Sequence, residues 1–150
     1  MKDSPPWARL KDVAAKRRDE SAQRVAGAMR IRDEAQRKLK MLLDYRSEYE
    51  ERMRANANRG IDAASLANYR TFLAQLERAV EQQRENLATA QRELDRTTQV
   101  WSEDRRRTET YQVLDDRVLD AKAEQDRRIE QRRADEWVAQ NRRGTRRFPR

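Results

Sequence analysis

Carboxylates are the side chains in this sequence whose type and number could support catalysis. Adjacent pairs occur at Asp115–Asp116 and Glu50–Glu51. Two carboxylates act as general acid and base only where a pocket excludes water and separates their pKa values. The chain has no cysteine and no histidine, which excludes thiol and serine–histidine nucleophiles and the usual zinc sites. Its three glycines form no phosphate-binding loop. We therefore expect no enzyme, and no catalytic, cofactor or metal site.

Aromatic side chains gather at two places and suggest protein docking instead of catalysis. Residues at steps of three and four share one face of a helix. One such face carries Leu42, Tyr45 and Tyr49, and a second carries Phe72, Leu76, Ala79 and Gln83. Two interpretations remain open: the aromatics widen a core near a loop, or they anchor a partner protein. Periodicity alone does not decide between them.

Basic residues exceed acidic ones and give the chain a formal charge of +8. The simplest interpretation is a solvated helix surface with ion pairs three and four residues apart. Arginines near the C-terminus alternate with acidic residues, and only residues 142–150 are purely basic. No groove-entering or base-stacking element accompanies them, so we do not expect nucleic-acid binding.

The composition and the heptad pattern indicate a coiled coil. Only 36% of the residues are hydrophobic and 41% are charged, which suits a fold that buries two positions in seven. An unbroken heptad stripe runs through Leu66, Tyr69, Leu73, Leu76, Val80, Gln83, Leu87, Ala90, Leu94, Thr97 and Trp101. Spacing of 3.5 residues keeps a narrow seam against a partner helix and imposes a left-handed supercoil. Together with Leu39 of the first half, the large members of this stripe (Leu66, Tyr69, Leu73, Val80, Leu87, Leu94 and Trp101) are the expected core.

The first half of the chain has a weaker heptad pattern and supplies the partner helix. One seam position holds Ala14, Ser21, Ala28, Ala35, Leu42 and Tyr49, and the other holds Arg18, Val25, Arg32, Leu39, Arg46 and Met53. Pro5 and Pro6 favour a helix start near Trp7. The stretch RANANRGID at residues 54–62 is typical of a turn, with Asp62 or Ser65 as the next helix cap.

We therefore predict an all-α fold: two long helices in an antiparallel left-handed coiled-coil hairpin, with the C-terminal helix extending beyond the paired region. The expected single domain has helices at about 7–55 and 63–141, a loop at 56–62 and a disordered basic tail at 142–150. Past Trp101 the same phase would bury Asp104, Thr108 and Asp115. We therefore expect pairing to stop at about residue 109 and residues 110–140 to project as a single helix.

Without a signal peptide or a membrane-length apolar run, the protein should be cytoplasmic.

Several segments resemble the FliJ family of small coiled-coil proteins in the bacterial flagellar type III export apparatus. They are LKDVAAK near residue 10, LKMLLDYRSEYEERM at 39–53, GID at 60–62, NYRTFLAQLERAVEQQRENL ending at 87, Trp101 and DEW at 135–137. The most specific feature is the tyrosine pair at 45 and 49 set against NYxxF at 68–72. The resemblance covers nearly the whole chain.

The resemblance implies a stalk similar to that of rotary ATP synthases. The end with both termini would enter the hexameric export ATPase, FliI, and promote its assembly and activity. The other end would contact the export-gate protein, FlhA, and the family also handles export chaperones. The implied gate-contact residues are Leu42, Tyr45, Tyr49, Phe72, Leu76 and Ala79; at the edges of this surface the chain has Lys38 and Gln83. The resemblance also implies association with the cytoplasmic face of the inner membrane, without insertion into it.

Other functions remain open at this point. The equivalent stalk of a virulence type III secretion system has a similar shape and role. A generic coiled-coil scaffold would self-associate, whereas an intramolecular hairpin should be a monomer when free.

Overall fold

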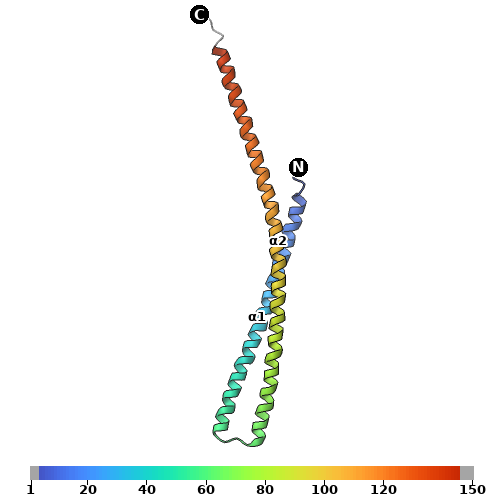
Figure 1. Cartoon of the computed structure of the whole chain (residues 1–150), viewed down its shortest axis with the longest axis vertical. Coiled ribbons are helices and arrows are strands. Elements are labelled where there is room, and N and C mark those ends of the chain that lie inside the picture. The colour runs from blue at the N-terminus through green and yellow to red at the C-terminus, as the bar shows by residue number, and fades with distance from the viewer. Residues whose placement is uncertain (1–3, 146–150) are drawn as a thin grey trace.

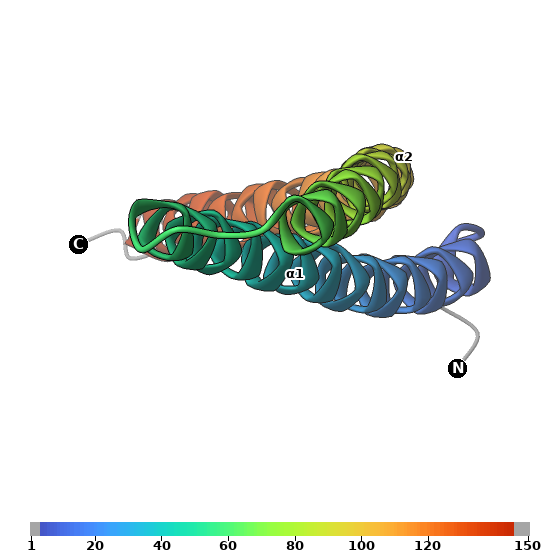
Figure 2. The same cartoon turned by 90° about the horizontal axis from the view of Figure 1, so that it is seen from below.

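A computed structural model describes residues 4–145 of the chain. It contains two helices, α1 (Ala8–Asn58) and α2 (Ala63–Thr145), which pack against each other as an antiparallel hairpin (Figure 1). No strand occurs within the described residues. Seen from the loop end, the helices curve and change sides along the rod, as supercoiled strands do (Figure 2). The predicted all-α hairpin is confirmed.

The connection between the helices is short and occupies residues 59–62. Arg59 and Gly60 donate backbone hydrogen bonds to the carbonyls of Asn56 and Ala57, both at 3.2 Å. Gly60 has a φ of 88°, the left-handed conformation that commonly ends a helix. Asp62 then caps α2, because its Oδ1 accepts the backbone N–H of Ser65 at 3.0 Å. Hydrogen bonding to the side chain of Ser65, together with this backbone bond, holds the pKa of Asp62 below its usual value.

The asparagines at 56 and 58 lie inside α1, not in the loop where the sequence pattern placed them. One left-handed residue is enough to turn the chain, and Gly60 provides it. Asn56 has another role: its side-chain amide donates a hydrogen bond to the hydroxyl of Tyr69 across the hairpin.

The core is a narrow seam in which small side chains of α1 accompany larger ones of α2. The buried positions are Ala14, Ser21 and Ala28 of α1, and Leu76, Val80, Ala90 and Leu94 of α2. Val80 is the most buried of them, at 1% exposed. The remaining expected core residues (Leu39, Leu66, Tyr69, Leu73, Leu87 and Trp101) are half-buried along the same seam.

Pairing continues well past Trp101, so the prediction that it stops at about residue 109 is wrong. Asp104 accepts a hydrogen bond from the hydroxyl of Ser21. Asp115 accepts one from Trp7 Nε1 at 2.8 Å and forms an ion pair with Lys11. The same heptad positions of α2 therefore stay at the interface. Each carboxylate has a polar partner on α1, and this contact offsets the cost of removing the carboxylate from water.

Beyond Asp115, α2 is a single helix. Every described side chain from Asp116 to Gly144 is exposed. At 1.5 Å per residue, residues 116–145 extend about 45 Å past the paired body, on the side where α1 begins (Figure 1). Of the expected tail at 142–150, residues 142–145 are helical, and residues 146–150 lie outside the described residues.

Candidate partner-docking surfaces

An aromatic cluster fills the space between the helices near the loop. Tyr45 and Tyr49 of α1 meet Tyr69 and Phe72 of α2. The ring centroids of Tyr49 and Phe72 are 4.5 Å apart, and those of Tyr49 and Tyr69 are 5.2 Å apart. Tyr45 contacts Phe72 edge to face, at 6.0 Å. Aromatic pairs in such geometries contribute about 0.5–1.5 kcal/mol beyond the burial of their area, so the cluster stabilises the loop end.

The cluster is partly core and partly surface. Tyr49, Tyr69 and Phe72 are half-buried, and partial burial raises the pKa of the Tyr49 hydroxyl, helped by its tyrosine neighbours. Tyr45 remains 45% exposed. Tyr49 therefore packs between the helices, as the core interpretation expects, whereas part of the Tyr45 ring stays accessible at the surface.

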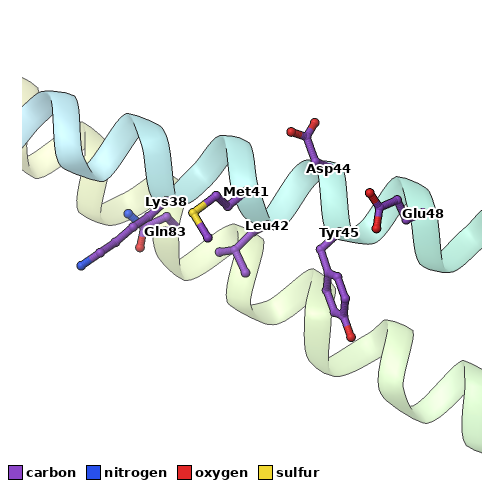
Figure 3. Close-up of a pocket in the computed structure, with 7 residues that line it drawn as sticks. All are labelled: Lys38, Met41, Leu42, Asp44, Tyr45, Glu48 and Gln83. Atoms are coloured by element: carbon purple, nitrogen blue, oxygen red, sulfur yellow. The ribbon is translucent and has the colours of Figure 1, made fainter.

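A groove of about 540 Å³ lies beside Tyr45. Its lining residues are Lys38, Met41, Leu42, Asp44, Tyr45 and Glu48 of α1, with Gln83 of α2 (Figure 3). Met41 is 70% exposed. Gln83 is fixed at one end of the groove, because its amide donates a 2.9 Å hydrogen bond to the carbonyl of Ala35.

The expected gate-contact residues gather at this end of the rod but differ in accessibility. Leu42 and Tyr45 line the groove, and Tyr49 and Phe72 belong to the aromatic cluster. Ala79 is half-buried, and Leu76, at 6% exposed, lies in the seam where a partner has little access to it. Lys38 and Gln83, which the sequence placed at the edges of the surface, line the groove itself.

Sequence reasoning missed Met41, Asp44 and Glu48 as groove residues. The available signal was Met41, a large apolar side chain one position before the seam residue Leu42. Asp44 and Glu48 resemble any solvated helix charges and gave no signal in the sequence.

The opposite end of the paired body is held by polar contacts. Lys11 and Trp7 both bond to Asp115, and these bonds hold the pKa of that carboxyl below its usual value. We call these three residues the terminal clasp. It lies where the single helix leaves the pair, so it joins the start of α1 to the last paired turn of α2.

Residues 4–144 contain no group of three or more acidic side chains placed to hold a metal ion. Neither helix has an apolar stretch long enough to cross a bilayer within the described residues.

Fold and surfaces together define a helical-hairpin protein with two different ends: an aromatic cluster and groove near the loop, and a single projecting helix at the other end. A family model described as "Flagellar FliJ protein" matches residues 4–147. The Flagellar FliJ protein of Salmonella typhi is 33% identical over 129 residues, covering 86% of this chain and 88% of that relative. That of Escherichia coli K12 is 31% identical over 138 residues, covering 92% and 94%. This chain belongs to the FliJ family, which confirms the resemblance noted in its sequence.

A solved structure shares the fold. The YscO homolog of Chlamydia trachomatis matches with a TM-score of 0.60, covering 97% of this chain and 98% of that one. Its sequence identity is 16%, so the likeness concerns the fold alone.

Proposed function

We propose that this protein is a stalk of the flagellar type III export apparatus, linking the export ATPase FliI to the gate protein FlhA. Membership of the FliJ family supports an export role. The observation that carries the proposal is the difference between the two ends of the rod. The loop end has an aromatic surface, and the other end has about 45 Å of single helix.

The projecting helix suits insertion into the pore of a ring. A lone helix with its side chains is about 10–12 Å across, much narrower than the paired body. Its exposed surface carries both apolar and charged groups, including Leu119 and Trp137, each 64% exposed. In this proposal the helix enters the ATPase hexamer and promotes its assembly and activity.

The loop end docks to the gate. Tyr45 and Leu42 supply accessible apolar surface, and Tyr49 and Phe72 hold Tyr45 in place from within the hairpin. Binding of export chaperones, and association with the cytoplasmic face of the inner membrane through these partners, belong to the same proposal. The protein acts as a connector and catalyses no reaction itself.

ATP hydrolysis by the cognate export ATPase tests the stalk. The full chain should stimulate hydrolysis most at ATPase concentrations where the hexamer is only partly assembled. A chain ending at Asp115 keeps the terminal clasp and should not stimulate. Absence of stimulation by the full chain at every concentration would contradict the proposal and favour an adaptor for gate or chaperones.

A further inference from the structure

We propose that the groove beside Tyr45 receives an apolar side chain of the export gate that is flanked by lysine or arginine, with Met41, Asp44 and Glu48 as the recognising residues. This inference rests on the proposed docking of the loop end to the gate and extends it to residues outside the aromatic cluster. The groove's lining, its charges and its fixed end support it.

The apolar part of the groove is available to a partner. Met41 is 70% exposed, so the hairpin itself makes little use of it. Figure 3 shows Met41 beside Leu42, with Tyr45 one turn further along α1. Methionine is flexible and polarizable, and adapts to differently shaped apolar groups. A volume of about 540 Å³ is within the range of ligand pockets and admits a large aliphatic or aromatic side chain.

The charges beside the groove select for a basic partner. Asp44 and Glu48 are four residues apart on α1, where like charges destabilise a helix. Neither carboxylate has an ion-pair or hydrogen-bond partner within residues 4–144. Lys38, the groove's one cation, pairs instead with Glu34 at 3.4 Å. The result is an acidic edge on a chain of net charge +8, complementary to Lys or Arg.

The far end of the groove is polar and held in place. Gln83 donates to the Ala35 carbonyl at 2.9 Å and accepts from Asn86 at 3.3 Å. Because Gln83 is held from both sides, the groove ends at a fixed amide. A partner segment must therefore place its apolar group between Gln83 and Tyr45 and its cations along Asp44 and Glu48.

Titration of the full-length protein with the cytoplasmic domain of the export gate tests the inference. Met41→Ala should weaken binding about tenfold, as loss of an interface anchor does. The double charge reversal Asp44→Lys with Glu48→Lys should weaken it at least as much and reduce its dependence on salt. The matched controls are Met29→Ala, at an exposed methionine outside the groove, and Asp126→Lys with Glu130→Lys, at an exposed acidic pair on the extension. Both controls should bind within about twofold of the parent.

The outcomes separate this inference from the proposed function. Loss of binding in Tyr45→Ala and Phe72→Ala, with parental binding in both Met41→Ala and the double charge reversal at Asp44 and Glu48, would overturn the inference and leave gate docking standing. A parent chain that does not bind the gate domain would overturn both. Circular dichroism of each variant checks that helix content is unchanged.

Crosslinking identifies the occupant directly. The chain has no cysteine, so Lys38→Cys, which lines the groove without being one of the proposed recognising residues, offers a unique attachment point for a photo-crosslinker. In a mixture with the gate domain, we expect the crosslinked gate peptide to carry an apolar residue next to Lys or Arg. A crosslink to an acidic gate segment, a crosslink to a second copy of this chain, or no crosslink to the gate would each overturn the inference.

Discussion

Single polar side chains fix how the two helices align over the terminal half of the hairpin. Ser21 is 2% exposed and meets Asp104, while the terminal clasp joins Trp7 and Lys11 to Asp115. A slip of either helix by one turn would separate these partners and leave carboxylates in the seam without donors. The polar layers therefore favour one register in a region where the apolar pattern is weak.

Replacing Ser21 with alanine tests the first polar layer. The hydroxyl has one proton and lies within hydrogen-bond reach of both Asp104 and the Arg17 carbonyl, the latter at 2.8 Å. Ser21→Ala should lower the free energy of unfolding by about 1 kcal/mol, because Asp104 loses its donor. Combining it with Asp104→Leu should restore stability. Urea denaturation measures Ser21→Ala, Asp104→Leu and the double variant. A double variant whose loss of stability equals the sum of the two single losses would contradict an interaction between Ser21 and Asp104.

The terminal clasp predicts a pH dependence. Its bonds from Lys11 and Trp7 lower the pKa of Asp115 in the folded state, so its stabilising effect is present above the unfolded pKa of about 4. The effect is lost as pH falls through the lower, folded pKa. Asp115→Asn should therefore melt at a lower temperature than the parent at pH 7, and the difference should shrink toward pH 2. A difference that stays constant between pH 7 and pH 2 would rule out the clasp.

At the scale of the elements, two glycines with opposite roles allow a matched test. Gly27 lies inside α1 and Gly60 has a φ of 88°, and neither position has an atom within 4 Å of an added Cβ. Gly27→Ala should raise the free energy of unfolding by about 1 kcal/mol, since alanine favours helix. Gly60→Ala should lower it by about 1 kcal/mol, since a side chain disfavours the left-handed conformation. Urea denaturation compares them; changes of the same sign would contradict these backbone roles.

The helices could be predicted from heptad spacing, because burial at two positions in seven leaves a periodic trace in the sequence. Val80 and Leu94 were expected in the core and are buried there. The extent of pairing could not be predicted, because Asp104 and Asp115 are acceptable in a seam only if donors such as Ser21 and Lys11 stand opposite. Such cross-helix matches depend on register, which a single heptad pattern does not give.

The proposed docking surface was predictable only in part. Tyr45 and Phe72 were found because aromatics at helical spacing are conspicuous in a polar chain. Which ring is exposed and which ring supports it depends on the spacing of the two helices near the loop. The sequence does not specify that spacing. Met41 and the two nearby carboxylates, Asp44 and Glu48, became recognisable only through the groove that they line.

At the scale of the whole molecule, the rod separates its two proposed contacts. The groove and aromatic cluster lie near the loop, whereas the extension begins after Asp115 at the other end. Residues 15–45 of α1 and the segment of α2 that packs against them lie between the two sites. At 1.5 Å per residue, these roughly 30 residues separate the sites by about 45 Å of paired body. Changes at one end should therefore leave the other end's binding intact.

The most direct test of this separation measures two properties of two variants: stimulation of the export ATPase and binding to the gate's cytoplasmic domain. We predict that the chain ending at Asp115 binds the gate like the parent but does not stimulate hydrolysis. We predict the reverse for Tyr45→Ala, with gate binding weakened about 30-fold, as expected for an anchor worth about 2 kcal/mol. If either variant lost both properties while its remaining residues stayed helical, or kept both, the account of a stalk with two independent ends would be contradicted.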